Sequence, residues 1–464
     1  MFIGNAHELS RRAFLRRSGQ LAAMGAASTY AMGLAGIGEA AAFTTDNDYK
    51  ALVCVFLYGG NDHGNTLIPY DTANYARYAA IRGGVALPRE SLAATALATP
   101  DGQTLTDDIA YALAPTMPRL KARFDEEALA PLLNVGPLVA PLTRAEFDSN
   151  SAPRPAKLFS HNDQQSTWQS SEPEGSPSGW GGRMGDLALS SNDNAMFTAI
   201  NATGNAVFLS GQRAVPYQVS SRGATLFEPL RRGNLYRSTT AASALDTILR
   251  AGGSSYMAND YAHMNARSIE YGQFVNDALA KASFATDFGS GNRLAEQLQT
   301  VASLIAARQS LGVKRQVFMV SMGGFDSHDG LIGKHEALLG QLDFALDAFY
   351  RATLELDVAP SVTTFTASDF GRTLASNGDG SDHGWGSFHF VLGGAVRGGR
   401  FYGRAPHVSV DADDQVGRGR LLPTTSVDEY SATFARWFGV SSSELPSVVP
   451  NIGRFATSDL GFMG

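Results

Sequence analysis

Aspartate and histidine occur close together at four places along this sequence. The pairs are Asp62 with His63, His161 with Asp163, Asp326 with His328, and Asp382 with His383. A single pair of this kind often serves only a helix cap or a turn. Repetition argues for chemistry, because imidazole nitrogens and carboxylate oxygens are the mixed ligands that zinc, manganese or calcium take. No thiolate competes, since the one cysteine, Cys54, lies inside an apolar run. The pattern therefore predicts a divalent metal site.

The elements that position these residues are short apolar runs that predict strands. Four such runs are recognisable, at residues 51–58, 316–321, 361–366 and 388–392. The first two lead into Gly-Gly-x-Asp, and the third leads into Ser-Asp-Phe-Gly. Continuous apolar runs are typical of strands buried on both faces, and open parallel sheets bind ligands at the carboxyl ends of their strands. We expect one cleft at that edge, formed by Asp62, Asp326, Asp369 and His383.

Amphipathic helices separate the predicted strands. Apolar residues recur at helical spacing in two stretches, at Leu294, Leu298, Val301 and Ile305, and at Leu338, Leu342, Leu346 and Phe349. Strands alternating with such helices predict an α/β fold with a mostly parallel central sheet flanked by helices. Residues 149–180 are rich in Ser, Pro, Gly and Asn and predict a long loop. We expect residues 181–290 to form an insertion or cap over the sheet.

The first 42 residues resemble an export signal. Adjacent Arg11 and Arg12 precede a weakly apolar stretch rich in Ala and Gly, and residues 40–42 are the small alanines that a signal peptidase accepts. A retained membrane anchor is the alternative, but glycines interrupt the run, which lacks the roughly 20 strongly apolar residues of a stable span. We expect a twin-arginine signal peptide at 1–42 and one domain at 43–464, periplasmic or secreted.

Composition narrows the class of partner. The formal net charge is −7, and the adjacent arginines stand in the N-terminal segment, so nucleic acid and anionic membrane surfaces are disfavoured as partners. One cysteine excludes an intrachain disulfide. Stability must then come from packing, which a chain of this length can supply through a large core.

Several motifs together resemble the DUF1501 family of exported bacterial proteins. They are the arginine signal, Leu-Tyr-Gly-Gly-Asn-Asp-His-Gly-Asn at 57–65, Ser-His at 160–161, Gly-Gly-Phe-Asp-Ser-His at 323–328, Ser-Asp-Phe-Gly-Arg-Thr at 368–373, Asp-His at 382–383, and Gly-Gly-Ala-Val-Arg-Gly-Gly at 393–399. Sequences of that family look related to the alkaline phosphatase and sulfatase superfamily. The resemblance implies an alkaline-phosphatase-like fold and metal-dependent hydrolysis.

The resemblance also implies roles for individual residues. Asp62 matches the acid that follows the first strand and holds a metal, and His383 matches the last histidine ligand. The full set of metal ligands that we expect is Asp62, His161, Asp326, His328, Asp369 and His383. Phe370 stands where the superfamily usually has histidine, so one of two metal sites is incomplete, or its ligand comes from elsewhere, such as His63 or His161.

The nucleophile is less clearly marked. The superfamily uses a Ser, Thr or modified Cys at a helix N-terminus, and Ser166 and Thr167 are the candidates here. Ordinary helix capping is the alternative for both residues. Arg372 could bind a phosphate or sulfate oxygen through its planar guanidinium, and a surface salt bridge is the alternative.

Two functions are compatible with these residues. The first is an exported metal-dependent hydrolase that acts on a small-molecule or glycan ester of phosphate or sulfate. The second is a non-catalytic envelope protein that keeps the fold to bind a ligand or partner. The Asp and His residues favour the first, whereas Phe370 and the unmarked nucleophile favour the second. Substrate, metal identity and oligomeric state are open at this point.

Overall fold

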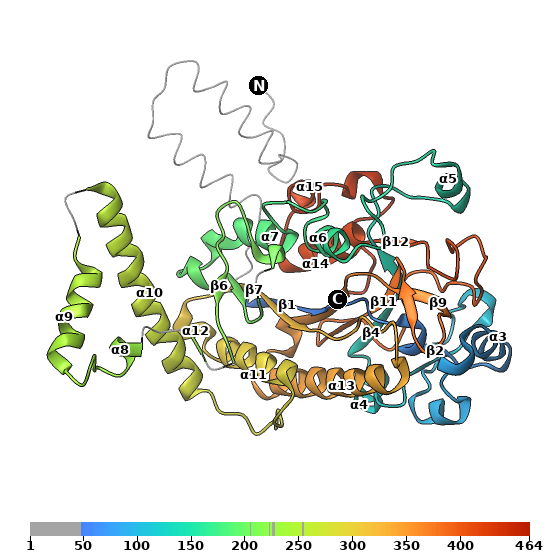
Figure 1. The fold of residues 1–464 in the computed structure, drawn as a ribbon, viewed down its shortest axis with the longest axis horizontal. Coiled ribbons are helices and arrows are strands. Elements are labelled where there is room, and N and C mark those ends of the chain that lie inside the picture. The colour runs from blue at the N-terminus through green and yellow to red at the C-terminus, as the bar shows by residue number, and fades with distance from the viewer. Residues whose placement is uncertain (1–47, 205, 222, 225–227, 253–254) are drawn as a thin grey trace, which may run out of the picture.

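The structure, a computed structural model, describes residues 48–464 except 205, 222, 225–227 and 253–254 (Figure 1). The export signal expected at residues 1–42 lies outside the described residues. Among the described helices, none combines the length and hydropathy that crossing a bilayer requires.

An eight-stranded sheet forms the centre of the molecule. Its strands, in spatial order, are β12 (Thr425–Ser426), β4 (Leu129–Gly136), β11 (Ser387–Gly393), β8 (Val362–Ser368), β1 (Lys50–Leu57), β7 (Arg315–Met322), β5 (Ala199–Asn201) and β6 (Tyr217–Gln218). Only β11 runs antiparallel to its two neighbours, and every other pairing in this sheet is parallel. The predicted mostly parallel α/β class is confirmed, and the four predicted strands correspond to β1, β7, β8 and β11.

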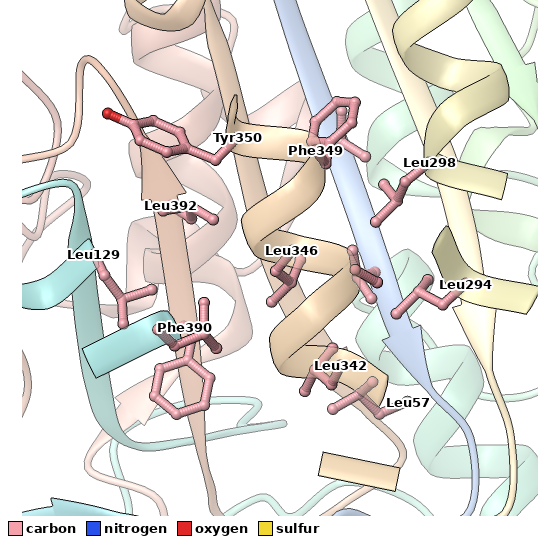
Figure 2. Packing of buried hydrophobic residues seen from close by; sticks show 14 of the residues in the cluster. Leu57, Leu129, Leu294, Leu298, Leu342, Leu346, Phe349, Tyr350, Phe390 and Leu392 are labelled. Atoms are coloured by element: carbon pink, nitrogen blue, oxygen red, sulfur yellow. The ribbon is translucent and has the colours of Figure 1, made fainter. Parts of the chain in front are cut away.

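Helices cover both faces of the sheet, and the residues of β1 alternate between them. Val53 and Val55 pack in one core with α11 (Arg293–Ala306) and α13 (Leu331–Glu355). Leu52 and Phe56 pack in a second core with α7 (Trp180–Ala188) and α14 (Val427–Phe438). Figure 2 shows the first core, in which leucines of α11 and α13 lie beside Leu57. A strand covered on both sides reads as a continuous apolar run, which explains why β1 was predictable.

Two small antiparallel sheets flank the main one. They are β2 (Leu67–Pro69) with β3 (Tyr111–Leu113), and β9 (Arg372–Ser376) with β10 (Ser381–His383). The other helices are α3 (Thr72–Arg82), α4 (Pro118–Asp125), α5 (Arg144–Ser149), α6 (His161–Ser170), α8 (Glu228–Arg231), α9 (Thr239–Arg250), α10 (Tyr256–Lys281), α12 (Arg308–Leu311) and α15 (Leu445–Val448).

Two segments differ from the sequence expectation. Residues 149–180, predicted as a long loop, contain α6, whose polar sequence has no apolar stripe to mark it as a helix. Residues 181–290, predicted as an insertion or cap, supply β5 and β6 to the central sheet. Within the same segment, α9 and α10 extend away from the sheet at its β6 end (Figure 1). Part of the expected insertion is therefore integral to the core fold.

Candidate metal centre

Four chain segments meet at the carboxyl edge of the sheet. Asp326 lies in the loop after β7, and Asp369 directly follows β8. His383 is the last residue of β10, which precedes β11, and His161 is the first residue of α6. Because β11 is antiparallel, its beginning lies at the same edge as the ends of β7 and β8. The topology thus brings together residues that are more than 200 positions apart.

Three histidine Nε2 atoms converge on the carboxylate of Asp326. Its Oδ1 lies 3.1 Å from Nε2 of His328 and 3.3 Å from Nε2 of His383, and its Oδ2 lies 3.6 Å from Nε2 of His161. The Nε2 atoms of His328 and His383 are themselves 2.9 Å apart. Ligand atoms of His161, Asp326 and His383 all lie within 4.8 Å of one another. Three imidazoles and one carboxylate form a donor set that suits a tetrahedral divalent ion.

The opposite ring nitrogen of each histidine has a fixed partner. These Nδ1 partners are Asp369 Oδ2 for His161 at 2.6 Å, Asp382 Oδ1 for His328 at 3.5 Å, and the carbonyl of Phe159 for His383 at 2.8 Å. Histidines that bind metals usually donate their second ring nitrogen to a carboxylate or carbonyl, which leaves the Nε2 lone pair free. This pattern is typical of histidines that bind a metal. A histidine that only caps a helix does not need a partner on each ring nitrogen.

The charge of the centre is set by buried and half-buried partners. Burial opposes ionisation of Asp326, but the hydrogen bond and charge of Arg372 outweigh it and hold the pKa of Asp326 below its ordinary value. The hydrogen bond that Asp369 accepts from His161 raises the pKa of His161, and burial lowers the pKa of His383. The side chains of Asp326 and His328 remain 46% and 45% exposed, so both are accessible from solvent.

Asp369 is brought to the centre, where it contacts the candidate ligand His161. Its Oδ2 lies against Nδ1 of His161 and accepts hydrogen bonds from Gln165 Nε2 and the backbone N–H of Gly59. The next residue, Phe370, packs its ring against His161 and His383, with ring centroids 4.8 and 4.7 Å apart. The aromatic side chain forms a wall of the centre, and His161 supplies an imidazole from α6.

Asp62 departs from the predicted ligand set. Its carboxylate is buried and accepts from Arg82 at 2.9 Å, from the hydroxyl of Ser381 at 2.6 Å and from the backbone N–H of Asn65 at 3.1 Å. Burial opposes its ionisation, but Arg82 and the neighbouring histidines hold the pKa of Asp62 well below its ordinary value. Asp62, expected as a metal ligand, therefore lies in a buried ion pair with Arg82.

The histidine beside Asp62 is also apart from the centre. His63 is buried with its ring edge against Phe388, and burial lowers its pKa to about 4. A cationic imidazole is therefore disfavoured there at neutral pH. Of the two residues expected to complete the site, the structure brings His161 to the centre and His63 to the core.

The residues expected to act on substrate have other partners. The hydroxyl of Ser166 donates to the carbonyl of Pro173, and that of Thr167 donates to the carbonyl of Asp163. The guanidinium of Arg372 is fully buried and donates to Asp326 and to the carbonyl of Gly59. Thr167 and Arg372 are buried and Ser166 is half-buried, and Arg372 holds the candidate ligand Asp326 in place.

One residue of the centre was not singled out from the sequence, and a second was noted only as the neighbour of a histidine. Phe159 has a left-handed backbone, with φ of 70°, which aims its carbonyl at His383. Asp382, whose Oδ1 lies 3.5 Å from Nδ1 of His328, was marked in the sequence by its position beside His383.

The fold and the histidine cluster define an α/β protein with a candidate metal centre at the carboxyl edge of its sheet. A family model described as "Protein of unknown function (DUF1501)" matches residues 49–428, and the chain belongs to that family. No curated protein sequence matches the chain.

Several solved structures are similar to this chain, with low sequence identity and low TM-scores. The lipoteichoic acid synthase LtaP from Listeria monocytogenes is 8% identical with a TM-score of 0.33, covering 85% of this chain and 72% of that chain. Ps i-CgsB in complex with k-i-k-neocarrahexaose is 10% identical with a TM-score of 0.34. The match covers 87% of this chain and 77% of that chain. A structure from work on metabolism of multiple glycosaminoglycans by Bacteroides thetaiotaomicron is 9% identical with a TM-score of 0.35, covering 85% and 74%. Scores this low transfer no function to this chain.

Proposed function

We propose that this protein is an exported, metal-dependent hydrolase of a phosphate or sulfate ester. The observation that carries the proposal is the convergence of three Nε2 atoms on Asp326 while each Nδ1 faces its own acceptor. The proposed ligands are His161, Asp326, His328 and His383. Three nitrogen donors favour zinc or manganese over calcium, which takes oxygen ligands. A divalent ion held there would act as a Lewis acid toward an ester oxygen.

The other residues of the centre position these ligands. Asp369 fixes the ring of His161, and Arg372 fixes the carboxylate of Asp326. Since the hydroxyls of Ser166 and Thr167 are bonded to backbone carbonyls, the geometry favours direct attack by water over a serine or threonine nucleophile. The exposed side of Asp326 leaves room for a small-molecule or glycan ester.

Export is part of the proposal. Arg11 and Arg12 precede the short apolar stretch of a twin-arginine signal. That route carries proteins that have already folded, which suits a cofactor inserted before export.

The test is a metal analysis combined with a substrate panel. We expect the purified protein, reconstituted with zinc or manganese and freed of excess ion, to hold about one ion per chain. His161→Ala and His383→Ala should lose that ion. The matched control is His407→Ala, because His407 also contacts an aspartate, Asp107 at 2.8 Å, and is similarly half-buried.

Activity is then measured on phosphate and sulfate monoesters of nitrophenol and on sulfated oligosaccharides. Hydrolysis that disappears in His383→Ala and persists in His407→Ala would support the proposal. A parent protein that takes up no metal, or equal metal in parent and His383→Ala, would overturn it. Metal uptake without hydrolysis of any ester would instead favour the second function, a non-catalytic ligand-binding protein.

A further inference from the structure

Two arginines, Arg418 and Arg420, lie on the Asp382 side of the metal centre. The carboxylate of Asp382 accepts from Arg418 at 2.7 Å and from the amide of Asn377 at 3.0 Å, and it also faces His328. A second guanidinium, that of Arg420, donates to the carbonyl of His383, the residue that follows Asp382. Of these two arginines, Arg418 forms the ion pair with Asp382.

Arg420 is anchored to the centre by two contacts. Its Nε donates to the carbonyl of His383 at 2.7 Å, and its guanidinium carbon lies over the ring of Phe159, 4.9 Å from the centroid. Phe159 also receives the Nδ1 proton of His383 on its carbonyl. The same strained residue thus positions a candidate metal ligand and the arginine beside it, which fixes their relative placement.

The outer edge of this guanidinium is available. Among the described residues, Arg420 has no carboxylate at ion-pair distance, and its remaining contact is a long one, 3.5 Å from Nη1 to the carbonyl of Gly417. Guanidinium has five N–H donors, so several remain to be satisfied by water or by a ligand. Side chains that pack over an aromatic ring lose less entropy on binding, because their conformation is already fixed.

We propose that Arg420 binds the anionic part of the substrate next to the metal centre. The planar N–H pair of arginine matches two oxygens of a tetrahedral oxyanion, and such charge-assisted bonds are strong. This proposal rests on the proposed function and narrows its substrate class. The substrate is an ester that keeps an ionised oxygen on phosphorus or sulfur, and neutral triesters and carboxylic esters are excluded.

Binding of inorganic phosphate and sulfate to the zinc-loaded protein tests the proposal. Calorimetric titration should give an affinity that falls about 10- to 100-fold in Arg420→Gln, the size of a lost charge-assisted hydrogen bond. Arg420→Lys keeps the charge but not the planar donor pair, so its affinity for the anions should lie between those of the parent and Arg420→Gln. Where hydrolysis is measurable, KM for the anionic ester should rise more than kcat falls.

Arg89→Gln is the matched control. Arg89 likewise donates its Nε to a carbonyl, that of Tyr70 at 2.8 Å, and lies over an aromatic ring with a similar half-burial. Unchanged phosphate affinity in Arg420→Gln, or a parent that binds neither anion, would overturn the proposal. Loss of zinc from Arg420→Gln would also overturn it, because the residue would then act only through His383. Anion binding that depends on Arg420 in a protein without hydrolytic activity would uphold this inference while the proposed function fails.

Discussion

Replacing Arg82 by methionine tests whether Asp62 belongs to a structural ion pair or to the metal centre. The side chain of Arg82 is fully buried, and that of Asp62 is 1% exposed. The guanidinium also donates to the carbonyls of Thr373 and Leu374 in β9, so it joins three parts of the chain. Arg82→Met keeps the stem that packs in the core and removes only the charged head.

The size of the effect follows from the charge that is left behind. Without Arg82, the carboxylate of Asp62 keeps only the Ser381 hydroxyl and the Asn65 N–H as donors. Removing one partner of a buried pair typically costs about 3–5 kcal/mol. In the double variant Asp62→Asn with Arg82→Met no uncompensated charge remains, so its loss of stability should be clearly smaller than the sum of the single losses.

The measurement is urea unfolding followed by tryptophan fluorescence, with a chelator present so that metal binding does not add to stability. Metal content is measured separately on protein reconstituted without chelator. We expect Asp62→Asn to keep its ion and Arg82→Met to lose stability. A cost below about 1 kcal/mol for Arg82→Met, the range of an exposed pair, would refute the structural assignment. Loss of the ion from a folded Asp62→Asn would restore Asp62 as a ligand.

Two further predictions concern single carboxylates. Asp369→Asn should weaken metal affinity about 10- to 100-fold by loosening His161, as measured by competition with a chelator, and unchanged affinity would contradict the orienting role. Burial raises the pKa of Asp428 to about 6 from its ordinary 3.8, so its proton binds more tightly in the folded state and stability is lost as the pH rises through this range. Asp428→Asn should therefore gain stability relative to the parent between about pH 4 and 7, on the order of 3 kcal/mol, and a constant difference across that range in urea unfolding would count against it.

The sheet could be predicted where burial on both faces leaves a continuous apolar run. This holds for β1, β7 and β8, and the helices α11 and α13 were marked by their apolar spacing. Strand β4 carries Pro131 inside it, and β5 and β6 have only three and two residues, so none of them has a clear pattern. Short and interrupted strands depend on their neighbours more than on their own sequence.

The candidate site was predictable in its residue types and less so in their roles. Pairs of Asp and His mark His161, Asp326 and His383 because they stand out in loop sequence. The role of Asp62 was not predictable, because its partner Arg82 lies 20 residues away on α3 and is recognised only once the helix has folded back. From the sequence alone, a carboxylate that follows a strand does not reveal whether it will pair with an arginine or with a metal ion.

The reversed strand β11 explains how the centre is assembled. Val391 pairs with Phe365 and Gly393 with Thr363, so the chain enters β11 beside the end of β8. His383, four residues before β11, thereby reaches the same edge as Asp326. The connection between His383 and β11 is tight, because a Cβ at Gly384 would lie 2.5 Å from a backbone oxygen of the loop after β8. The site therefore depends on glycine at position 384 as much as on its ligands. A side chain there would push apart the loop after β8 and the segment that carries His383.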